Sequence, residues 1–276
     1  MEKRPVAYQL YSAREEAAKN LDAVLAAVSE MGYDGVEFAG FYGLDADTVR
    51  MKLEKNGLQA VSSHVPMQLI EKDMFGTIAF HKQVGCAYIA IPYLDDEMRP
   101  GGPRFARALQ TIGLFGRLCR MAGITLLYHN HDFEFVTVSG QYGLDFLYSA
   151  LPAEYLQSEI DVCWVKYAGV CPEAYLRQYK GRCPVVHLKD YVGTKGEAVP
   201  YGLIGKEEKK AAGTDGIPFE FRPFGHGCQD VQGVLTAAIE SGAEWFVVEQ
   251  DLSVGRTPLE AARMSIDTLR QAGVKR

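Results

Sequence analysis

Two hydrophobic periodicities alternate along the chain, a short β-rich run and then a helical stripe. The first apolar run, 6–10, is followed by Ser12 and Glu15 at the spacing of a capping box. Apolar residues over 21–28 then have helical spacing, and Gly32 follows at the position where helices commonly end. Since the same order of strand, helix and glycine recurs down the chain, the pattern predicts repeated βα units.

The glycines and the β-rich runs mark out these repeats. Six of the seven helix-to-strand junctions carry a glycine, which adopts the left-handed conformation that ends many helices. These glycines are Gly32, Gly57, Gly85, Gly123, Gly181 and Gly242. The eight β-rich runs are 6–10, 36–38, 58–65, 86–94, 124–130, 158–165, 183–189 and 244–251. Strands that alternate with helices in this way are typical of a parallel sheet covered on both faces.

The chain length favours a closed barrel over an open sheet. A (β/α)8 barrel typically needs about 250 residues, and this chain has 276. An open doubly wound sheet normally carries a glycine-rich phosphate fingerprint after its first strand, where this chain has the segment 11–14 without glycine. We therefore expect an α/β fold, a single-domain (β/α)8 TIM barrel over 1–276. The glycine-rich interval 192–229, between the seventh and eighth strands, is expected to be a long functional β7-α7 loop.

Composition and charge narrow the class of protein. With 47% hydrophobic and 23% charged residues, the chain can build a large core and is not disordered. Its net charge of −6 argues against affinity for nucleic acid or an anionic membrane surface. The cysteines form no CxxC pair, the amino terminus lacks the apolar stretch of a signal peptide, and no apolar run is long enough to span a bilayer. We expect a cytoplasmic protein with reduced cysteines that binds neither nucleic acid nor membrane.

Titratable side chains gather at the ends of the predicted strands. In a (β/α)8 barrel the catalytic residues stand at the carboxyl ends of the strands, on the face built by the βα loops. The side chains at these positions are Glu37, His64, His129, His131, Asp132, Glu134, Asp161, His187, Lys189, Asp190, Glu249 and Asp251. This end of the barrel is therefore the expected active site.

Four of these residues form a candidate set of metal ligands. They supply three carboxylates and one imidazole from four neighbouring strands, and they are Glu134, Asp161, His187 and Glu249. An oxygen-rich set with one nitrogen suits Mn²⁺, Mg²⁺ or Co²⁺ better than Zn²⁺. We therefore expect a divalent metal ion as cofactor.

Side-chain alternation tests this assignment, because residues two apart on a strand share a face. His187 and Lys189 share a face that is consistent with the barrel lumen. On the fifth run His129 and His131 share one face, and Glu134 has the opposite parity. Glu134 is therefore a ligand only if the strand ends before it, and His129 or His131 is the rival ligand from that strand.

Other residues at this end of the barrel are expected to bind a small sugar substrate. They are Glu37, His64, His129 and Trp164. An aromatic wall such as Trp164 is what a sugar ring packs against. His64 also fits the alternative of a hydrogen-bonded core histidine.

Five segments, in order along the chain, carry a family resemblance. They are YHNHDFEF at 128–135, EIDVCW at 159–164, HLKD at 187–190, GHG at 225–227 and VEQD at 248–251. Together they resemble the sugar phosphate isomerase/epimerase family of the xylose-isomerase-like TIM barrel superfamily, over nearly the whole chain. The resemblance implies a barrel whose divalent metal is held by Glu, Asp, His and Glu, which map onto the four candidate ligands above. It also implies isomerisation or epimerisation of a sugar, and it suggests a homo-dimer or homo-tetramer.

The chain departs from parts of that superfamily. Its relatives include endonucleases acting at abasic sites, inosose dehydratases and subunits that cleave C-glycosides. Many epimerases have a histidine at the position of Trp164, so a substrate contact made by that histidine is not expected here. The segment 91–93, at the end of the fourth strand, offers none of the ligands that an endonuclease with three metal ions requires. With the acidic net charge, this argues against an endonuclease.

Proton transfer next to a carbonyl is the mechanism that these residues favour. The metal would chelate two oxygens of a keto-sugar and stabilise the enediolate left when a proton departs. Glu249 is the expected base, His131 or Glu134 returns the proton on the other face, and Lys189 stabilises the oxyanion. A hydride shift between adjacent carbons would use the same metal without a base.

Two other functions are compatible with the same residues. A metal-dependent lyase or dehydratase would expel a β-substituent from the same enediolate, acting on a 3-keto-glycoside or an inosose-like substrate. A sugar-binding barrel without catalysis would bind no divalent ion.

Overall fold

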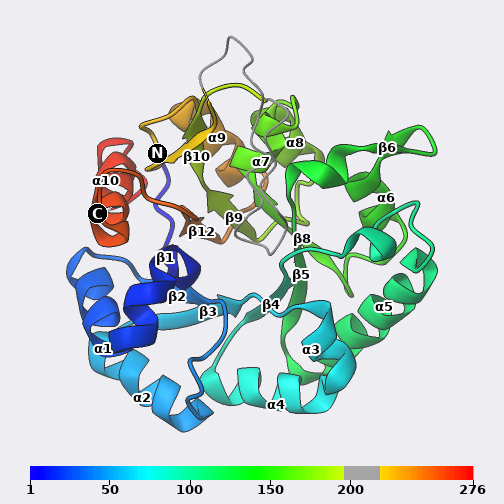
Figure 1. The fold of residues 1–276 in the computed structure, drawn as a ribbon, viewed down its shortest axis with the longest axis horizontal. Helices are drawn as coiled ribbons and strands as arrows, with labels where there is room; N and C mark the ends of the chain where they lie inside the picture. Colours follow the sequence, from blue (N-terminus) through cyan, green and yellow to red (C-terminus); the bar gives the residue numbers. More distant parts are fainter. Residues whose placement is uncertain (196–217, 276) are drawn as a thin grey trace.

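The computed structural model describes residues 1–195 and 218–275, and one eight-stranded parallel sheet forms its centre (Figure 1). The strands lie in the order β3-β2-β1-β12-β9-β8-β5-β4, which is their order along the chain taken around a ring. Their bounds are β1 (Val6–Gln9), β2 (Gly35–Phe38), β3 (Gln59–Ser63), β4 (Tyr88–Ile91), β5 (Thr125–His129), β8 (Gln157–Asp161), β9 (Val185–Leu188) and β12 (Trp245–Val248).

Backbone hydrogen bonds between β3 and β4, the two ends of this order, bring the sheet nearly to a closed barrel. The Val65 N–H donates to the Ala90 carbonyl at 2.8 Å, and the Ala87 N–H donates to the Val61 carbonyl at 3.1 Å. The predicted α/β (β/α)8 barrel is therefore confirmed, with a strand in each of the predicted β-rich runs.

The prediction of a β-strand over the whole sixth run, 158–165, is wrong for residues 162–165. β8 ends at Asp161, and helix α7 begins at the next residue. The Asp161 carboxylate caps this helix, because its Oδ1 accepts hydrogen bonds from the N–H groups of Cys163 at 2.8 Å and Trp164 at 3.1 Å. Residues 162–165 are buried in the helix, so their apolar character did not distinguish a helix from a strand.

Helices surround the barrel on its outer side (Figure 1). They are α1 (Arg14–Glu30), α2 (Ala46–Asn56), α3 (Met67–Lys72), α4 (Met74–Val84), α5 (Phe105–Ala122), α6 (Gly143–Ser149), α7 (Val162–Tyr167), α8 (Pro172–Gln178), α9 (Val231–Glu240) and α10 (Pro258–Gln271). Short 3₁₀ helices lie at η1 (Leu10–Ala13), η2 (Asp96–Met98) and η3 (Asp132–Phe135). The six glycines predicted to end helices all have positive φ, from 63° to 96°.

The capping box predicted at the start of the first helix is wrong. Ala13 precedes α1 and provides no side-chain cap. The Oγ of Ser12 instead accepts a hydrogen bond from the N–H of Gln250 at 3.0 Å. Ser12 thereby ties the end of β1 to the segment that follows β12.

An apolar floor fills the lumen toward the amino-terminal ends of the strands. Its buried side chains are Ala7, Val61, Tyr88, Ala90, Leu127, Val185 and Val247. On β9 and β12 the residues two positions further on are His187 and Glu249, which are also buried, as the alternation predicts. Because the floor closes one end of the lumen, the polar groups gather at the carboxyl ends of the strands.

The predicted loop at 192–229 begins and ends beside a small antiparallel ribbon. In this ribbon β10 (Asp190–Val192) pairs with β11 (Glu220–Arg222). Residues 196–217 of the predicted loop lie outside the described residues. The Asp190 carboxylate accepts five backbone hydrogen bonds of 2.9–3.1 Å, from Tyr191, Gly225, Gly227, Cys228 and Gln229. Asp190 therefore holds the returning chain against the barrel.

Smaller features complete the described fold. A hairpin of β6 (Thr137–Val138) and β7 (Gln141–Tyr142) precedes α6. All six cysteines are unpaired. Within 1–195 and 218–275, no helix combines the length and the apolar character needed to cross a bilayer.

Helix α5 packs so closely on a neighbouring loop that Gly116 accepts no side chain. A Cβ at this position would lie 1.9 Å from the backbone oxygen of Tyr155, which cannot rotate away. We expect Gly116→Ala to lower the free energy of unfolding by about 2 kcal/mol or more, measured by urea denaturation. Gly113→Ala, in the same helix, is the control, because its Cβ would meet only the end of the Leu151 side chain at 3.1 Å. Equal losses in the two variants would contradict this packing.

Candidate functional site

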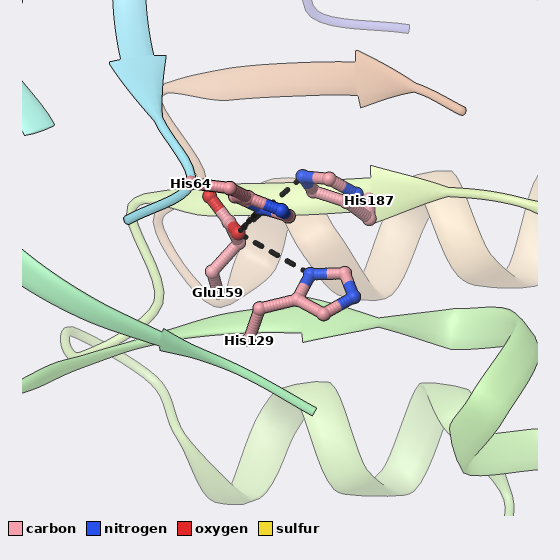
Figure 2. Close-up of side chains that lie close together, drawn as sticks. All are labelled: His64, His129, Glu159 and His187. Atoms are coloured by element: carbon pink, nitrogen blue, oxygen red, sulfur yellow. Dashed lines mark hydrogen bonds and ion pairs between the residues drawn. The ribbon is translucent and has the colours of Figure 1, made fainter. Parts of the chain in front are cut away.

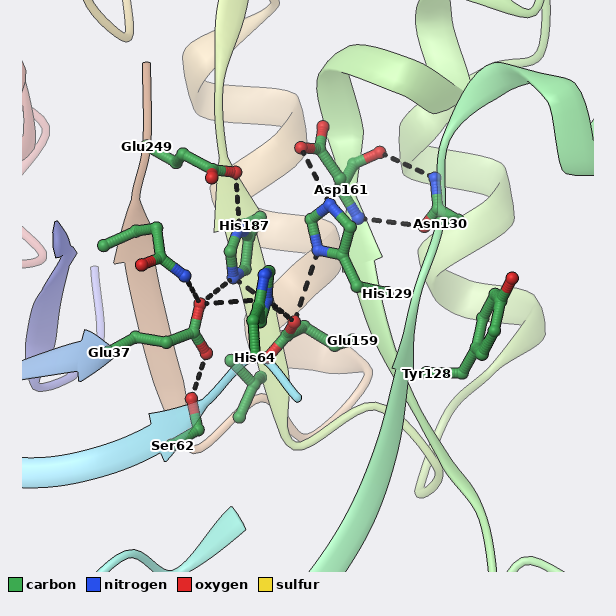
Figure 3. A network of polar contacts seen from close by, with 12 residues as sticks. Glu37, Ser62, His64, Tyr128, His129, Asn130, Glu159, Asp161, His187 and Glu249 are labelled. Carbon is green, nitrogen blue, oxygen red and sulfur yellow. Dashed lines mark hydrogen bonds and ion pairs between the residues drawn. The ribbon is translucent and has the colours of Figure 1, made fainter. Parts of the chain in front are cut away.

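Polar side chains occupy the lumen above the apolar floor in two groups, and Figure 3 shows part of each. The inner group comprises Gln9, Glu37, Ser62, His64 and Glu159, and the outer group comprises Asp161, Lys189, Glu249 and Asp251. On β8, Glu159 precedes Asp161 by two residues, so both face the lumen and Glu159 lies deeper. Two imidazoles, those of His129 and His187, lie between the groups.

Lys189 is the centre of the outer group. Its buried ammonium lies 3.3 Å from Asp161 Oδ2, 2.8 Å from Glu249 Oε2 and 2.9 Å from Asp251 Oδ1. Burial opposes the charge of Lys189, but the three carboxylates hold its pKa well above the ordinary value. Burial also raises the pKa of Asp251 to about 6, against the effect of Lys189. The outer group therefore concentrates negative charge around one ammonium.

The capping role of Asp161 orients its second oxygen. With Oδ1 bound to the start of α7, Oδ2 is directed into the lumen, 3.7 Å from His129 Nε2. This buried oxygen makes no hydrogen bond to any described residue, although it pairs with the Lys189 ammonium at 3.3 Å. A buried oxygen of this kind is suited to bind a cation.

His129 and His187 each present one nitrogen to the outer group. His187 Nδ1 forms a hydrogen bond of 3.0 Å with Glu249 Oε2, and its Nε2 lies 2.7 Å from Glu37 Oε2. His129 Nε2 faces Asp161, and its Nδ1 lies 3.2 Å from Glu159 Oε2. Burial holds the pKa of His129 well below its ordinary value, so its ring is neutral near pH 7.

The inner group joins the carboxylates of Glu37 and Glu159 to histidine (Figure 3). Figure 2 shows Glu159 among His64, His129 and His187. Glu37 Oε2 accepts a hydrogen bond from Gln9 Nε2 at 2.5 Å, and Ser62 Oγ donates to Glu37 Oε1. His64 Nε2 lies 2.8 Å from Glu159 Oε2 and 3.2 Å from Glu37 Oε2. Glu37 is fully buried, whereas the His64 side chain keeps 10% of its surface exposed. Substrate binding by these two residues stays a prediction.

Two sets of side chains are arranged so that they could hold a metal ion. The outer set is His129, Asp161, His187 and Glu249, and the inner set is His64, His129, Glu159 and His187. In each set the donor atoms lie within 4.8 Å of one another. The outer set brings together the predicted residues Asp161, His187 and Glu249, and it takes His129, the rival named from the fifth strand, in place of Glu134. Carboxylate and imidazole donors of this kind suit divalent transition metals.

Glu134 lies outside both sets. β5 ends at His129, before Glu134, which is the condition under which Glu134 was predicted to be a ligand. The 3₁₀ helix η3, however, turns the Glu134 side chain back onto the preceding residues. Its Oε1 accepts from the Tyr128 hydroxyl and its Oε2 from the His131 N–H, both at 2.7 Å. Burial raises the pKa of Glu134 to about 8, although both donors act in the opposite direction. The contacts of Glu134 therefore position His131.

Aromatic rings line the site around His131. Its ring stacks on Phe133 at 5.0 Å and 3° and lies 5.2 Å from Trp164. Lys189 Nζ lies 5.4 Å from the Trp164 ring centroid and 5.5 Å from that of Phe221. Burial holds the pKa of His131 well below its ordinary value, so this ring is also neutral near pH 7. The predicted wall residue Trp164 thus lies beside Lys189 and His131.

Sequence reasoning gave no role to Glu159, Gln9 or Ser62. Glu159 had a usable signal, because it shares the parity of Asp161 on one strand and therefore faces the lumen. Gln9 and Ser62 are ordinary polar residues of predicted strands, and nothing in their spacing distinguishes them.

Comparison with known proteins agrees with the fold. A family model described as xylose isomerase-like TIM barrel matches residues 25–272, and the chain belongs to this family. No curated protein matches the sequence.

Solved structures are similar over the full length of the chain. Two sugar phosphate isomerase/epimerases from Parabacteroides distasonis both have a TM-score of 0.77, with 17% and 21% identity. The first alignment covers 100% of this chain and 99% of that protein, and the second covers 99% and 100%. A probable 3-DHS dehydratase from Bacillus anthracis has a TM-score of 0.72 and 11% identity, covering 98% of this chain and 99% of that protein. At these identities the likeness establishes the fold.

Replacing Lys189 tests the charge balance of the outer group. Lys189→Met leaves Asp161, Glu249 and Asp251 buried without their ammonium, and removing one partner of a buried ion pair costs about 3–5 kcal/mol. We expect a loss of that order in the free energy of unfolding of the metal-free protein, measured by urea denaturation at pH 7. Lys19→Met is the control, because this lysine of α1 is exposed and its replacement should change stability little. A Lys189→Met variant as stable as the control would show that the carboxylates do not need the ammonium.

Proposed function

We propose that the chain is a divalent-metal-dependent isomerase or epimerase of a keto-sugar or sugar derivative. The observation that carries the proposal is the outer set of donors, two carboxylates and two imidazoles, at the carboxyl ends of the barrel strands. Catalytic groups of (β/α)8 enzymes stand at this end. The likeness to sugar phosphate isomerase/epimerases supports the reaction class.

Asp161, Glu249, His129 and His187 are the residues that would hold the ion. Asp161 Oδ2 is a buried oxygen without a hydrogen bond to any described residue, and His129 is neutral, so both suit a cation. Oxygen and imidazole donors favour Mn²⁺, Mg²⁺ or Co²⁺. When bound, such an ion supplies Lewis-acid polarisation of a sugar carbonyl.

Glu249 is the carboxylate best placed to accept a proton from the carbon next to that carbonyl. Burial opposes its ionisation, but Lys189 and His187 hold its pKa well below the ordinary range, so Glu249 is ionised at neutral pH. Lys189 lies 2.8 Å from Glu249 and stabilises negative charge that develops on a neighbouring substrate oxygen.

His131 is the second acid–base group of the proposal. Its neutral ring accepts or returns a proton, and its stacking on Phe133 fixes the ring plane. Trp164 and Phe221 form aromatic walls beside Lys189, against which the apolar face of a sugar packs.

Metal binding is the first test, because the proposal depends on the outer donors. Calorimetric titration of Mn²⁺ into chelator-stripped protein is expected to show binding that is lost in Asp161→Asn and weakened at least tenfold in His129→Ala. Glu134→Gln is the control and should retain the wild-type affinity, because Glu134 contacts Tyr128 and His131 instead. Loss of binding in Glu134→Gln with retention in His129→Ala would assign the ligand of the fifth strand to Glu134.

Solvent deuterium tests the proton-transfer step. Keto-sugars with and without phosphate are incubated with the Mn²⁺-loaded protein in D₂O, and the product is examined by mass spectrometry. We expect deuterium at the epimerised or isomerised carbon, and a fall in kcat of about 10²–10⁴-fold in His131→Gln with unchanged Mn²⁺ affinity. Full turnover without deuterium in the product would show that the reaction proceeds by a hydride shift and not by proton transfer. An unsaturated product would show that the reaction is an elimination. Elimination begins with the same proton removal as isomerisation.

A further inference from the structure

Four donor atoms converge below the outer group, two from the carboxylates of Glu37 and Glu159 and two from the imidazoles of His64 and His187 (Figure 3). Glu37 Oε2 lies 3.2 Å from His64 Nε2 and 2.7 Å from His187 Nε2. Glu159 Oε2 lies 2.8 Å from His64 Nε2 and 3.4 Å from His187 Nε2. A tetrahedral ion with bonds of about 2.1 Å places its ligands about 3.4 Å apart. Small movements of these side chains therefore complete a coordination shell.

Buried polar atoms in this group lack hydrogen bonds among the described residues. His187 is fully buried, and its Nε2 makes no aligned hydrogen bond although an oxygen of Glu37 lies 2.7 Å away. The Oε1 of Glu159 is also buried without a hydrogen bond. Buried polar atoms are normally satisfied, so this convergence of atoms calls for a partner at their centre.

The charges of the inner group match one divalent cation. Glu37 and Glu159 are both 0% exposed. Within the described residues, their ion-pair partners are histidines, whereas the outer carboxylates have the ammonium of Lys189. Burial opposes protonation of His64 and His187, but the two carboxylates raise the pKa of both imidazoles. A divalent cation between the carboxylates would supply the positive charge that protonated imidazoles supply in its absence.

His187 can serve the inner position while the outer ion remains bound. Its Nδ1 forms the hydrogen bond to Glu249 Oε2, and its Nε2 faces the inner carboxylates. When Nδ1 carries the proton and donates it to Glu249, the lone pair of Nε2 binds the inner ion, as is usual for metal-binding histidines. His187, named above among the ligands of the outer ion, then binds the inner ion instead. The outer ion keeps Asp161, Glu249 and His129, and its other positions are open to substrate oxygens.

We infer that Glu37, His64 and Glu159 of the inner group, together with His187, are the ligands of a second cation site below the outer set. Two nitrogens and two carboxylate oxygens in tetrahedral geometry suit Zn²⁺ or Co²⁺. The ion joins β2, β9 and β8 to the residue that follows β3, so four of the barrel's strands are linked beneath the reacting end. It stabilises the barrel and does not contact the substrate.

Metal stoichiometry tests this inference. The full chain is stripped with chelator, loaded with Zn²⁺ and desalted, and the retained metal is measured by mass spectrometry. We expect two equivalents in the wild type, one in His64→Ala and Glu37→Gln, and one in the matched outer variant Asp161→Asn. The double variant His64→Ala/Asp161→Asn should retain none.

Substitution with Co²⁺ identifies which ion remains, because tetrahedral Co²⁺ absorbs visible light strongly. The absorption should persist in Asp161→Asn and disappear in His64→Ala. If the inner variants fail to fold, the wild type decides by itself, since two equivalents with tetrahedral absorption support the site and a single equivalent without it overturns the site.

The outcomes separate this inference from the proposed function. A single wild-type equivalent that is lost in Asp161→Asn and kept in His64→Ala overturns the inner site and leaves the proposed function intact, with protons on the imidazoles compensating the carboxylates. A single equivalent that is lost in His64→Ala and kept in Asp161→Asn supports the inner site and refutes the outer ion. Absence of bound metal overturns both.

Discussion

Compensation of buried negative charge is the constraint on which this barrel depends. Five carboxylates stand in the lumen, with exposed fractions of 0% for Glu37, Glu159 and Asp161, 5% for Glu249 and 12% for Asp251. Removing such groups from water costs several kcal/mol each unless a cation or strong hydrogen bonds replace the solvent. The positions of Lys189, His64, His129 and His187 follow from this requirement, because each lies between two or more carboxylates.

Rigid backbone features place these charges with little freedom. Asp161 is at once the last residue of β8, the cap of α7 and a lumen carboxylate, so a helix terminus orients the oxygen that faces the site. Asp190, the residue after Lys189, has a structural role, since its carboxylate oxygens accept hydrogen bonds from five backbone N–H groups. Sites built on strand ends and helix caps hold their geometry better than sites on free loops.

Much of the site could be predicted from strand parity. His187, Lys189, Asp161 and Glu249 were predicted at strand ends, and in the structure ion pairs join all four. Parity works there because a strand directs alternate side chains to one face as long as it remains a strand. It stops working where the strand ends, and Glu134 lies beyond that point, in a 3₁₀ turn whose own hydrogen bonds decide the direction of its side chain.

The sequence by itself determined the architecture, the number of the strands and their order along the chain, and which residues share a face on the fifth, seventh and eighth strands. These properties follow from local periodicity and from the glycines between elements, and each involves only neighbours along the chain. Only the tertiary structure decided which donors converge, such as Glu159 with His64, 95 residues apart, or His187 with Glu249, 62 residues apart. Their separation depends on barrel closure and on how far each side chain reaches across the lumen, and no local pattern carries that information.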